Sequence, residues 1–411
     1  MDDHFDAAET RDAEVRERAL FDSLPAHLAR SIAAAPGLAR HLEGVDPEAV
    51  TDRAALAKLP VLRKAELMQA QADAPPFGGF AVLEQLAGSR LFSSPGPIWE
   101  PQGLGADPWG AARALHAAGF RAGDVVHCAL SYHMTPGGFI MDEGLRVLGC
   151  TVFPAGVGNT DLQVEAMGAL KPVAYVGTPD YLKVLLDRAD ETGTDVEQLT
   201  RAMVSGGALF PAMRTAYAER GVSVMQSYAT ADLGIVAYET QSGGTVHPGM
   251  VVNEGLIVEI LRPGTGDPVA AGEVGELVVT NFSAVYPLVR FATGDLTKQL
   301  AEASPCGRTN MRIAGWMGRA DQRTKVKGMF VDPAQIAALR KRHDGITGAR
   351  LVVKREGASD VMELLVTGTG LDLEAVEISL RDVTRLGGTV VRVDSLPNDG
   401  KVIADERDYD A

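Results

Sequence analysis

Two charged segments, separated by a short polar run, combine residue types that suit nucleotide binding. Phe291-Ala-Thr-Gly-Asp295 places a glycine directly before a carboxylate, and we expect this pair at the end of a strand formed by Val285–Phe291. A carboxylate held there can accept hydrogen bonds from both hydroxyls of a ribose. Arg319 follows further along the chain, and its planar guanidinium can donate to the same sugar or to a phosphate. Either segment alone could also be an ordinary strand and polar turn.

A second group of candidate residues follows two successive predicted strands. The first strand runs into Ser205-Gly206-Gly207-Ala208, and the second runs into Ser227-Tyr-Ala-Thr-Ala-Asp232. A turn with two glycines allows an adenine ring to lie flat against the backbone. Tyr228 can then stack on the other face of the ring. Asp232 can hold a Mg²⁺ ion that bridges phosphate oxygens.

The composition limits the class of protein. The chain has 411 residues, of which 46% are hydrophobic, and this is enough for one large core and a smaller domain. The formal net charge of -15 argues against nucleic acid as the main partner, because phosphate backbones are bound by clustered Lys and Arg. No apolar run approaches the roughly 20 residues that span a bilayer, so we expect no membrane partner.

The N-terminal segment and the cysteines favour a cytoplasmic location. Residues 1–20 contain interspersed acidic and basic residues and no apolar stretch, which is not the pattern of a signal peptide. Cys128, Cys150 and Cys306 are few, odd in number and without CxxC spacing, as is typical of reduced intracellular thiols. The apolar neighbours of Cys128 and Cys150 predict that both are buried.

Helix and strand patterns alternate between residues 107 and 190. This alternation predicts an α/β fold with parallel β-α-β units and helices on both faces of the sheet. The segment 238–281 adds a β-rich part to this N-terminal domain. The last ninety or so residues have the order of a small ferredoxin-like α+β unit. The predicted domains are therefore 1–320 and 321–411.

The loop 131–139 is a candidate binding site for an apolar substrate. It follows a predicted strand, Asp124–Leu130, and open α/β sheets bind ligands at the carboxyl ends of their strands. Tyr132, Met134 and Phe139 can line an apolar pocket there. The same side chains could equally be part of the core.

Together these motifs resemble the AMP-forming acyl and aryl CoA ligases, and in particular the phenylacetate-CoA ligase family. The resemblance extends over nearly the full length. It is most specific in the segments 148–181, 290–295, 318–328 and 397–401. The last segment is similar to the terminal Pro…Gly-Lys motif of the family. The resemblance implies that Lys401 is the lysine of the adenylation step.

The resemblance implies a reaction in two steps. A carboxylic acid, aromatic or otherwise apolar, attacks the α-phosphate of ATP in the presence of Mg²⁺, which gives an acyl-adenylate and pyrophosphate. The thiolate of coenzyme A then displaces AMP. Between the steps the small domain turns about a hinge at Asp321 and presents the loop around Lys327 to the thiol. The catalytic residues would be Lys401 and Asp232.

The resemblance also implies which residues contact the substrates. The implied ATP and AMP contacts are Ser93, Ser94, Ser205, Gly206, Gly207, Ala208, Tyr228, Ala229, Thr230, Asp295, Arg319 and Lys401. The implied contacts to the acid are Tyr132, Met134, Gly138, Phe139 and Thr230. The implied contacts to CoA are Lys327, Gly328 and Met329.

Two motifs depart from the family pattern. In place of a phosphate loop rich in glycine and threonine, the chain has Ser93-Ser-Pro-Gly-Pro-Ile-Trp-Glu-Pro101, and Glu100 stands near the position of a lysine. Proline offers no N–H to an anion, so we expect loose phosphate contact and a gain in ATP affinity from Glu100→Lys. A plain surface turn is the alternative. In the Tyr-Gly-x-Ser/Thr-Glu motif, Ala229, Ala231 and Asp232 replace the glycine, the hydroxyl residue and the glutamate.

Several alternatives stay open on the sequence alone. Thr240 and the solitary His247 stand where some family members have zinc ligands, so we expect no zinc site. The altered phosphate loop is compatible with a degenerate module that binds nucleotide and regulates. The thiol acceptor could be the pantetheine of a carrier protein in place of CoA. The chain could also form a homodimer.

Overall fold

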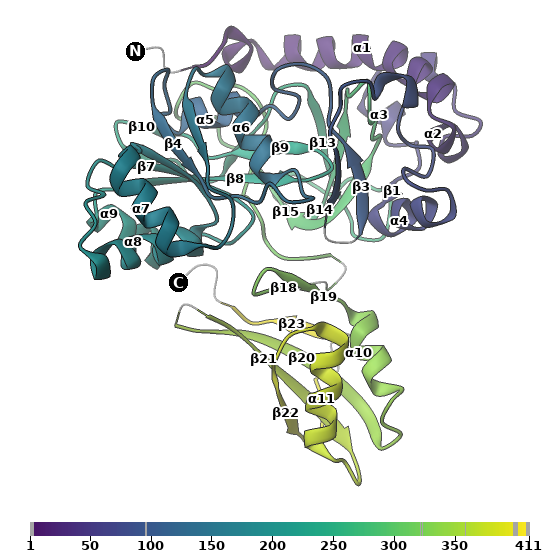
Figure 1. The fold of residues 1–411 in the computed structure, drawn as a ribbon. Coiled ribbons are helices and arrows are strands. Elements are labelled where there is room, and N and C mark those ends of the chain that lie inside the picture. Colours follow the sequence, from purple (N-terminus) through teal and green to yellow (C-terminus); the bar gives the residue numbers. More distant parts are fainter. Residues whose placement is uncertain are drawn as a thin grey trace. The chain divides into compact units, whose positions relative to one another are not determined.

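The first of the two units into which the chain divides is built on a large mixed sheet (Figure 1). The units are Met1–Met317 and Gly318–Ala411, and each is described here by itself. Their boundary falls shortly before the expected hinge residue Asp321, which lies outside the described residues. The computed structural model describes residues 4–94, 97–320, 322, 324–357, 359–397 and 402–407.

Within the described part of the chain, the large sheet has nine strands in the order β16-β17-β12-β9-β8-β7-β6-β4-β5. The strands from β5 to β8 run parallel, and the pairs from β8 to β16 run antiparallel. The strands are β4 (Val125–Cys128), β5 (Thr151–Pro154), β6 (Ala174–Gly177), β7 (Arg201–Val204), β8 (Ser223–Thr230), β9 (Gly234–Tyr238), β12 (Met250–Val252), β16 (Gln299–Leu300) and β17 (Arg312–Ile313).

Helices cover both faces of the parallel part of this sheet (Figure 1). Along β6, Ala174 and Val176 face the core around α5 and α6, and Tyr175 faces the core around α7 to α9. Strands buried on both faces are typical of parallel sheets. The predicted α/β fold class is therefore confirmed. The helices are α5 (Ala111–Ala117), α6 (Gly137–Val147), α7 (Thr160–Leu170), α8 (Pro179–Thr192) and α9 (Pro211–Glu219).

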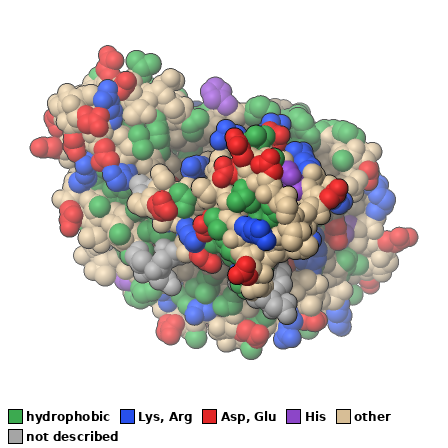
Figure 2. Space-filling view, turned by 90° about the horizontal axis from the view of Figure 1, so that it is seen from below, with side chains coloured by type: hydrophobic (Ala, Val, Ile, Leu, Met, Phe, Trp, Pro, Cys, Tyr) green, Lys and Arg blue, Asp and Glu red, His purple; other side chains and the backbone are tan. Residues whose placement is uncertain are grey.

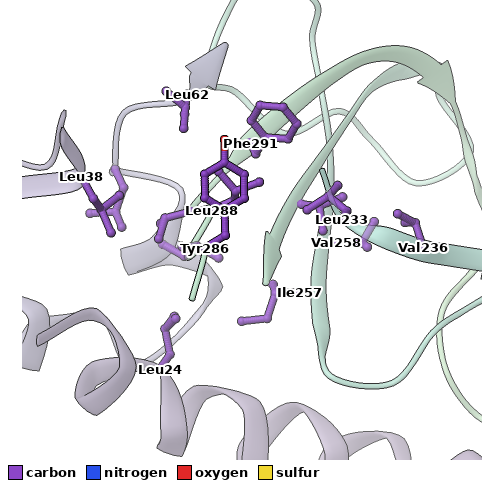
Figure 3. Close-up of a cluster of buried hydrophobic side chains, with 14 of the residues drawn as sticks. Leu24, Leu38, Leu62, Leu233, Val236, Ile257, Val258, Tyr286, Leu288 and Phe291 are labelled. Atoms are coloured by element: carbon purple, nitrogen blue, oxygen red, sulfur yellow. The ribbon is translucent and has the colours of Figure 1, made fainter. Parts of the chain in front are cut away.

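A second sheet of the first unit has the order β1-β15-β14-β13, with β1 and β15 parallel. Its inner face packs on helices of the N-terminal segment, and Leu24, Leu38, Val258 and Phe291 lie in the shared core (Figure 3). This core fixes β1 and thereby the start of α4. The elements are α1 (Ala13–Ala34), α2 (Pro36–His41), α3 (Arg53–Leu56), α4 (Lys64–Asp73), β1 (Leu62–Arg63), β13 (Leu256–Leu261), β14 (Gly275–Asn281) and β15 (Phe291–Thr297).

The prediction of a strand over Val285–Phe291 is wrong. The strand there is β15, Phe291–Thr297, so Asp295 lies within a strand and not beyond its end. Residues 285–290 form a loop, because Pro287 has no backbone N–H to offer a neighbouring strand. The side chain of Asn281 also accepts one backbone N–H of this loop at 3.0 Å and donates to one of its carbonyls at 3.2 Å.

Shorter elements complete the first unit. A hairpin of β2 and β3 follows the N-terminal helices, and the antiparallel pair β10 and β11 lies beyond β9 in the chain. These elements are η1 (Ala7–Thr10), η2 (Pro47–Ala49), η3 (Leu83–Gln85), β2 (Leu91–Ser94), β3 (Ile98–Pro101), β10 (Gln241–Ser242) and β11 (Thr245–Val246).

The described residues of the second unit form a four-stranded sheet with the order β22-β21-β20-β23 and a separate hairpin of β18 and β19. Ile336 of α10 and Leu380 of α11 are buried against Leu351 and Leu364 of the sheet. The predicted helices and strands of this segment are present. They are β18 (Thr324–Val326), β19 (Met329–Val331), α10 (Pro333–Arg340), β20 (Ile346–Glu356), β21 (Ser359–Gly368), α11 (Leu373–Thr384), β22 (Thr389–Arg392) and β23 (Ile403–Asp405).

The surface carries charges of both signs. On the face drawn in Figure 2, Lys and Arg side chains lie among Asp and Glu side chains. Cys128 and Cys150 are buried, as predicted. In the part of the chain that the structure describes, no helix combines the length and the apolarity needed to cross a membrane.

Candidate active site

Asp295 on β15 is held by two aromatic side chains. The hydroxyl of Tyr228 on β8 donates to Oδ2 of Asp295 at 2.6 Å, and Nε1 of Trp316 donates to Oδ1 at 2.9 Å. Gly294, immediately before it, has a φ of +76°, which few residues other than glycine adopt. The structure thus brings together Tyr228 and Asp295, which the sequence proposes for the same nucleotide. Trp316 has no signal in the sequence that identifies it as part of the site.

The glycine turn lies beside the same strand. β7 and β8 are parallel neighbours, so residues after the end of β7 lie next to the middle of β8. Ser205 donates from Oγ to the carbonyl of Ser227 at 3.0 Å, and the side-chain amide of Gln226 donates to the carbonyl of Gly207 at 3.2 Å. Ser205 is buried, whereas Gly206 is exposed with a φ of +72°. Ala208 and the two glycines therefore form a turn that leaves some backbone accessible to a ligand.

The turn between β8 and β9 carries Asp232. Ala229 and Thr230 belong to the end of β8, and Oγ1 of Thr230 accepts the backbone N–H of Leu233 at 3.2 Å. The carboxylate of Asp232 is fully buried. Its Oδ2 accepts a hydrogen bond from Nζ of Lys64 at 3.0 Å, and Lys64 is the first residue of α4. Sequence reasoning missed Lys64, because only the tertiary fold brings it to Asp232.

The segment 93–101 is a hairpin and not a plain surface turn, so that alternative is wrong. β2 and β3 pair in the register Phe92–Glu100 and Ser94–Ile98, which places Ser94 and Glu100 on one face. Both are buried, with exposed fractions of 6% and 2%. The hydroxyl of Ser94 donates to Oε1 of Glu100 at 2.6 Å. Ser93 lies on the opposite, more accessible face of the hairpin.

The helix α4 anchors this hairpin. The side-chain amide of Gln71 donates to the carbonyl of Trp99 at 2.8 Å, and its oxygen accepts the N–H of Trp99 at the same distance. The amide of Gln71 also lies 3.2 Å from the hydroxyl of Tyr286. Because Lys64 is on the same helix, α4 positions both the hairpin and the cation of the site.

Glu100 and Asp232 lie within hydrogen-bonding range of each other. Burial and the neighbouring carboxylate of Asp232 raise the pKa of Glu100 well above its ordinary value, against the lowering effects of Ser94 and Lys64. Burial and the same two acids also raise the pKa of Tyr286. The expected gain in ATP affinity from Glu100→Lys assumed a partly exposed charge that turns toward the phosphates, whereas Glu100 is buried beside Asp232. The gain itself stays a prediction. A lysine there would be a buried cation beside the half-buried Lys64.

The candidate acid loop packs on the first turns of α6. The rings of Tyr132 and Phe139 meet edge to face with centroids 5.1 Å apart, and the hydroxyl of Tyr132 donates to Oδ2 of Asp142 at 3.1 Å. A Cβ on Gly138 would lie 2.7 Å from the ring of Tyr132, so only glycine allows this contact. Met134 is 70% exposed at a φ of +63°. The loop thus pairs two packed rings with one exposed thioether.

The residues proposed for CoA belong to the second unit. Lys327 and Gly328 form the turn between β18 and β19 with φ values of +47° and +84°, and Met329 is 41% exposed. The backbone N–H of Lys327 donates to Asp360 at 3.1 Å. Arg319, half-buried, also lies in this unit. Lys401 and Asp321 lie outside the described residues.

Hydrogen bonds connect the residue that follows the expected hinge with the residues that follow Lys401. Oε1 of Gln322 accepts the backbone N–H groups of Val402 and Ile403 at 2.6 and 3.3 Å. Gln322 thereby holds the start of β23 to the segment before β18. The sequence gives no sign of this contact.

Around Thr240 and His247, the ring of His247 lies 3.0 Å from the hydroxyl of Ser242. Among the residues that the structure describes, no three His, Cys, Asp or Glu side chains form a group able to hold a metal ion. A metal ion at the Asp232 site would therefore take part of its ligands from a bound substrate or from water.

Comparisons with known proteins agree with this geometry. Residues 109–284 match the model of the AMP-binding enzyme family. The phenylacetate-coenzyme A ligase of Thermus thermophilus is 31% identical over 336 residues, which cover 79% of this chain and 74% of the relative. The chain belongs to the phenylacetate-CoA ligase family.

Further relatives support this assignment. The phenylacetate-coenzyme A ligase of Aromatoleum evansii is 30% identical over 343 residues, which cover 79% of this chain and 74% of the relative. A crystal structure of 2-hydroxyisobutyryl-CoA ligase with 2-HIB-AMP and CoA has the same fold, with a TM-score of 0.81, 24% identity, and coverage of 98% of this chain and 92% of that one. The family consists of adenylate-forming CoA ligases, and the predicted family and enzyme class are confirmed.

Proposed function

We propose that this chain activates an apolar carboxylic acid, aromatic in the first instance, with Mg-ATP and transfers the acyl group to CoA. The observation that carries this assignment is the contact between Tyr228 and Asp295. It joins the carboxylate suited to a ribose with the strand that borders the glycine turn. A nucleotide with its adenine on Ser205–Ala208 and its ribose at Asp295 would then have its phosphates near Asp232.

The nucleotide would be held by groups that the fold already brings close together. Adenine would lie between the backbone of Gly206-Gly207 and the ring of Tyr228, with Ala229 and Thr230 along β8. Asp295 would exchange its bonds to Tyr228 and Trp316, wholly or in part, for the ribose hydroxyls. Arg319 of the second unit would donate to the same sugar or to a phosphate. Groups that need little reorganisation contribute most to transition-state stabilisation.

A magnesium ion fits the residues around Asp232. Oδ1 of Asp232 is buried and has no partner outside the carboxyl pair among the described residues, and Mg²⁺ is often held by one or two carboxylates together with substrate phosphates. When bound, the ion would neutralise charge on the phosphates as the acid attacks. Lys64, with its side chain 24% exposed, would face the same phosphates. Ser93 and Ser94 would contribute from the hairpin, although the hydroxyl of Ser94 is already used by Glu100.

The acid would lie on the loop 131–139. Tyr132, Gly138 and Phe139 offer an apolar surface, Met134 can cover it, and Thr230 lies at the end of β8 toward the phosphates. The polar contact of Tyr132 with Asp142 keeps the ring edge toward Phe139. An aryl ring would therefore meet other rings, where edge-to-face contacts are favourable.

The second half-reaction would involve the second unit. Lys401 would bridge the carboxylate and the α-phosphate in the adenylation step, and a turn about Asp321 would then bring Lys327-Gly328-Met329 to the CoA thiol. One site can serve both half-reactions if the catalytic lysine leaves when the thiol arrives. In this proposal, the domain 1–320 would bind ATP and the acid, and the domain 321–411 would supply Lys401 and the contacts to CoA.

The test is acid-dependent release of pyrophosphate over a panel of arylacetic, benzoic and fatty acids, followed by thioester formation with CoA and with a carrier-protein pantetheine. We expect release with aryl acids and transfer to free CoA. Binding of ATP without release for any acid would favour the regulatory module, and faster transfer to the carrier protein would change the acceptor.

A further inference from the structure

Two buried carboxyl groups from separate segments meet beside the proposed phosphate site. Glu100 comes from β3, and Asp232 comes from the turn between β8 and β9. The residues are 2% and 7% exposed. Neither acid is part of a surface charge cluster, because both are buried.

In each carboxyl group, one oxygen accepts a hydrogen bond from a neighbouring side chain, and the other has no partner outside the carboxyl pair. Oδ2 of Asp232 accepts from Lys64, and Oε1 of Glu100 accepts from Ser94. Oδ1 of Asp232 and Oε2 of Glu100 are buried and have no donor outside the carboxyl pair among the described residues. Since the two side chains lie within hydrogen-bonding range of each other, the remaining oxygens border one common space.

The space between the two acids suits a cation. Oε2 of Glu100 and Oδ1 of Asp232 have no partner outside the pair, and the ammonium of Lys64 is bound to the other oxygen of Asp232. A divalent cation there would replace the proton that the raised pKa of Glu100 assigns to the metal-free pair. Hard divalent cations with oxygen ligands, such as Mg²⁺ and Mn²⁺, suit a pair of carboxylates next to phosphates.

We infer that Glu100 and Asp232 together form a two-carboxylate site for the divalent cation that accompanies ATP, with Oε2 and Oδ1 as its protein ligands. The inference rests on the proposed function, because nucleotide phosphates complete the coordination. It also explains why Glu100 stands where a phosphate loop would need a positive charge. The side chain binds the metal and leaves the contact with phosphate to Lys64.

The length of the two acids supports this division. Asp232 reaches one methylene less far than glutamate would, and Glu100 reaches toward it from the facing hairpin. If Glu100 compensates for the short side chain, a glutamate at position 232 should make Glu100 dispensable. This gives a rescue variant, Glu100→Gln with Asp232→Glu.

The experiment measures Mn²⁺ by electron paramagnetic resonance, which follows the loss of the free-ion signal, in the presence of α,β-methylene-ATP. Binding of this analogue without metal is measured separately by calorimetry. We expect Glu100→Gln and Asp232→Asn each to weaken Mn²⁺ binding about tenfold or more, in the range known for altered metal sites. Analogue affinity without metal should stay within about twofold, and the rescue variant should recover most of the Mn²⁺ affinity.

Glu84→Gln is the matched control, since it removes one exposed carboxylate of the same unit and should leave Mn²⁺ binding unchanged. Thermal unfolding of each variant shows whether the fold persists. Unaltered Mn²⁺ affinity in a folded Glu100→Gln variant would overturn the inference and leave the proposed function intact. If the wild type fails to bind the analogue with or without Mn²⁺, the proposed function itself is overturned.

Discussion

The ammonium of Lys64 lies 3.0 Å from Oδ2 of Asp232 and joins the first turn of α4 to the turn between β8 and β9. The carboxylate is fully buried, whereas 24% of the surface of the Lys64 side chain is exposed to solvent. An incoming phosphate can therefore reach the lysine. A helix with no counterpart among the predicted nucleotide motifs thus supplies a cation to the site.

Lys64→Met should weaken Mg-ATP binding and adenylation together. A hydrogen bond to a charged group contributes roughly 1.5–3 kcal/mol, so we expect the KM for ATP to rise about tenfold or more. Initial rates of acid-dependent pyrophosphate release check this. Lys183→Met removes a lysine from a surface ion pair on α8 and should change nothing. An unchanged KM in Lys64→Met would show that the lysine only neutralises Asp232.

Asp295→Asn should weaken nucleotide binding through the ribose. The carboxylate has two oxygens to offer to two hydroxyls, and the amide has one. We expect roughly tenfold to a hundredfold lower affinity for ATP. The informative comparison is 2′-deoxy-ATP. The wild type should bind it much more weakly than ATP, and the variant should bind it only slightly more weakly than ATP. Equal discrimination by both proteins would remove Asp295 from the ribose site.

Gln322→Ala should impair the first half-reaction more than the second. Its side chain holds the backbone N–H groups of Val402 and Ile403, next to the proposed catalytic Lys401. Lys401→Ala itself should lower adenylation by about 10²–10³, by analogy with the loss of one preorganised donor. Thiol transfer from preformed acyl-adenylate should survive both changes. A matching loss in the two half-reactions would argue for a general effect on the fold of the second unit.

His27 on α1 should make stability depend on pH. It is 5% exposed, and burial lowers its pKa from 6.5 to about 4. The unfolded chain therefore binds more protons between these values, and the free energy of unfolding should fall as the pH drops from about 6.5 to about 4. The shift corresponds to about 3 kcal/mol. In His27→Gln this part of the pH dependence should vanish, and denaturant unfolding at a series of pH values measures it.

The local sequence pattern predicted one part of the candidate site, and the other part depends on tertiary packing. The glycine turn follows β7, and Tyr228 lies in the neighbouring parallel strand β8, so their proximity was predictable from the alternation of helices and strands. Asp295 comes from another sheet, and its contact with Tyr228 depends on how the sheets pack. Trp316 contacts Asp295, and Gln322 contacts the backbone next to Lys401. Both residues lie in irregular segments, where no periodicity predicts which way a side chain points.

The hairpin of β2 and β3 was predictable in principle. Phe92 and Ser94 on one strand and Ile98 and Glu100 on the other alternate with more exposed residues, which is the pattern of a half-buried hairpin. The prolines in this segment suggested a surface turn instead. Pro101 is compatible with a strand because it ends β3, where a missing N–H matters least.

The most direct test of the central claim is pyrophosphate–ATP exchange in the presence of an aryl acid, with wild type and Asp232→Asn compared at equal folded fraction. The account predicts exchange that requires the acid and Mg²⁺ in the wild type. It also predicts a loss of at least about tenfold in the variant, with little change in melting temperature. Exchange of wild-type magnitude in Asp232→Asn would contradict it, as would nucleotide binding by the wild type without exchange for any acid.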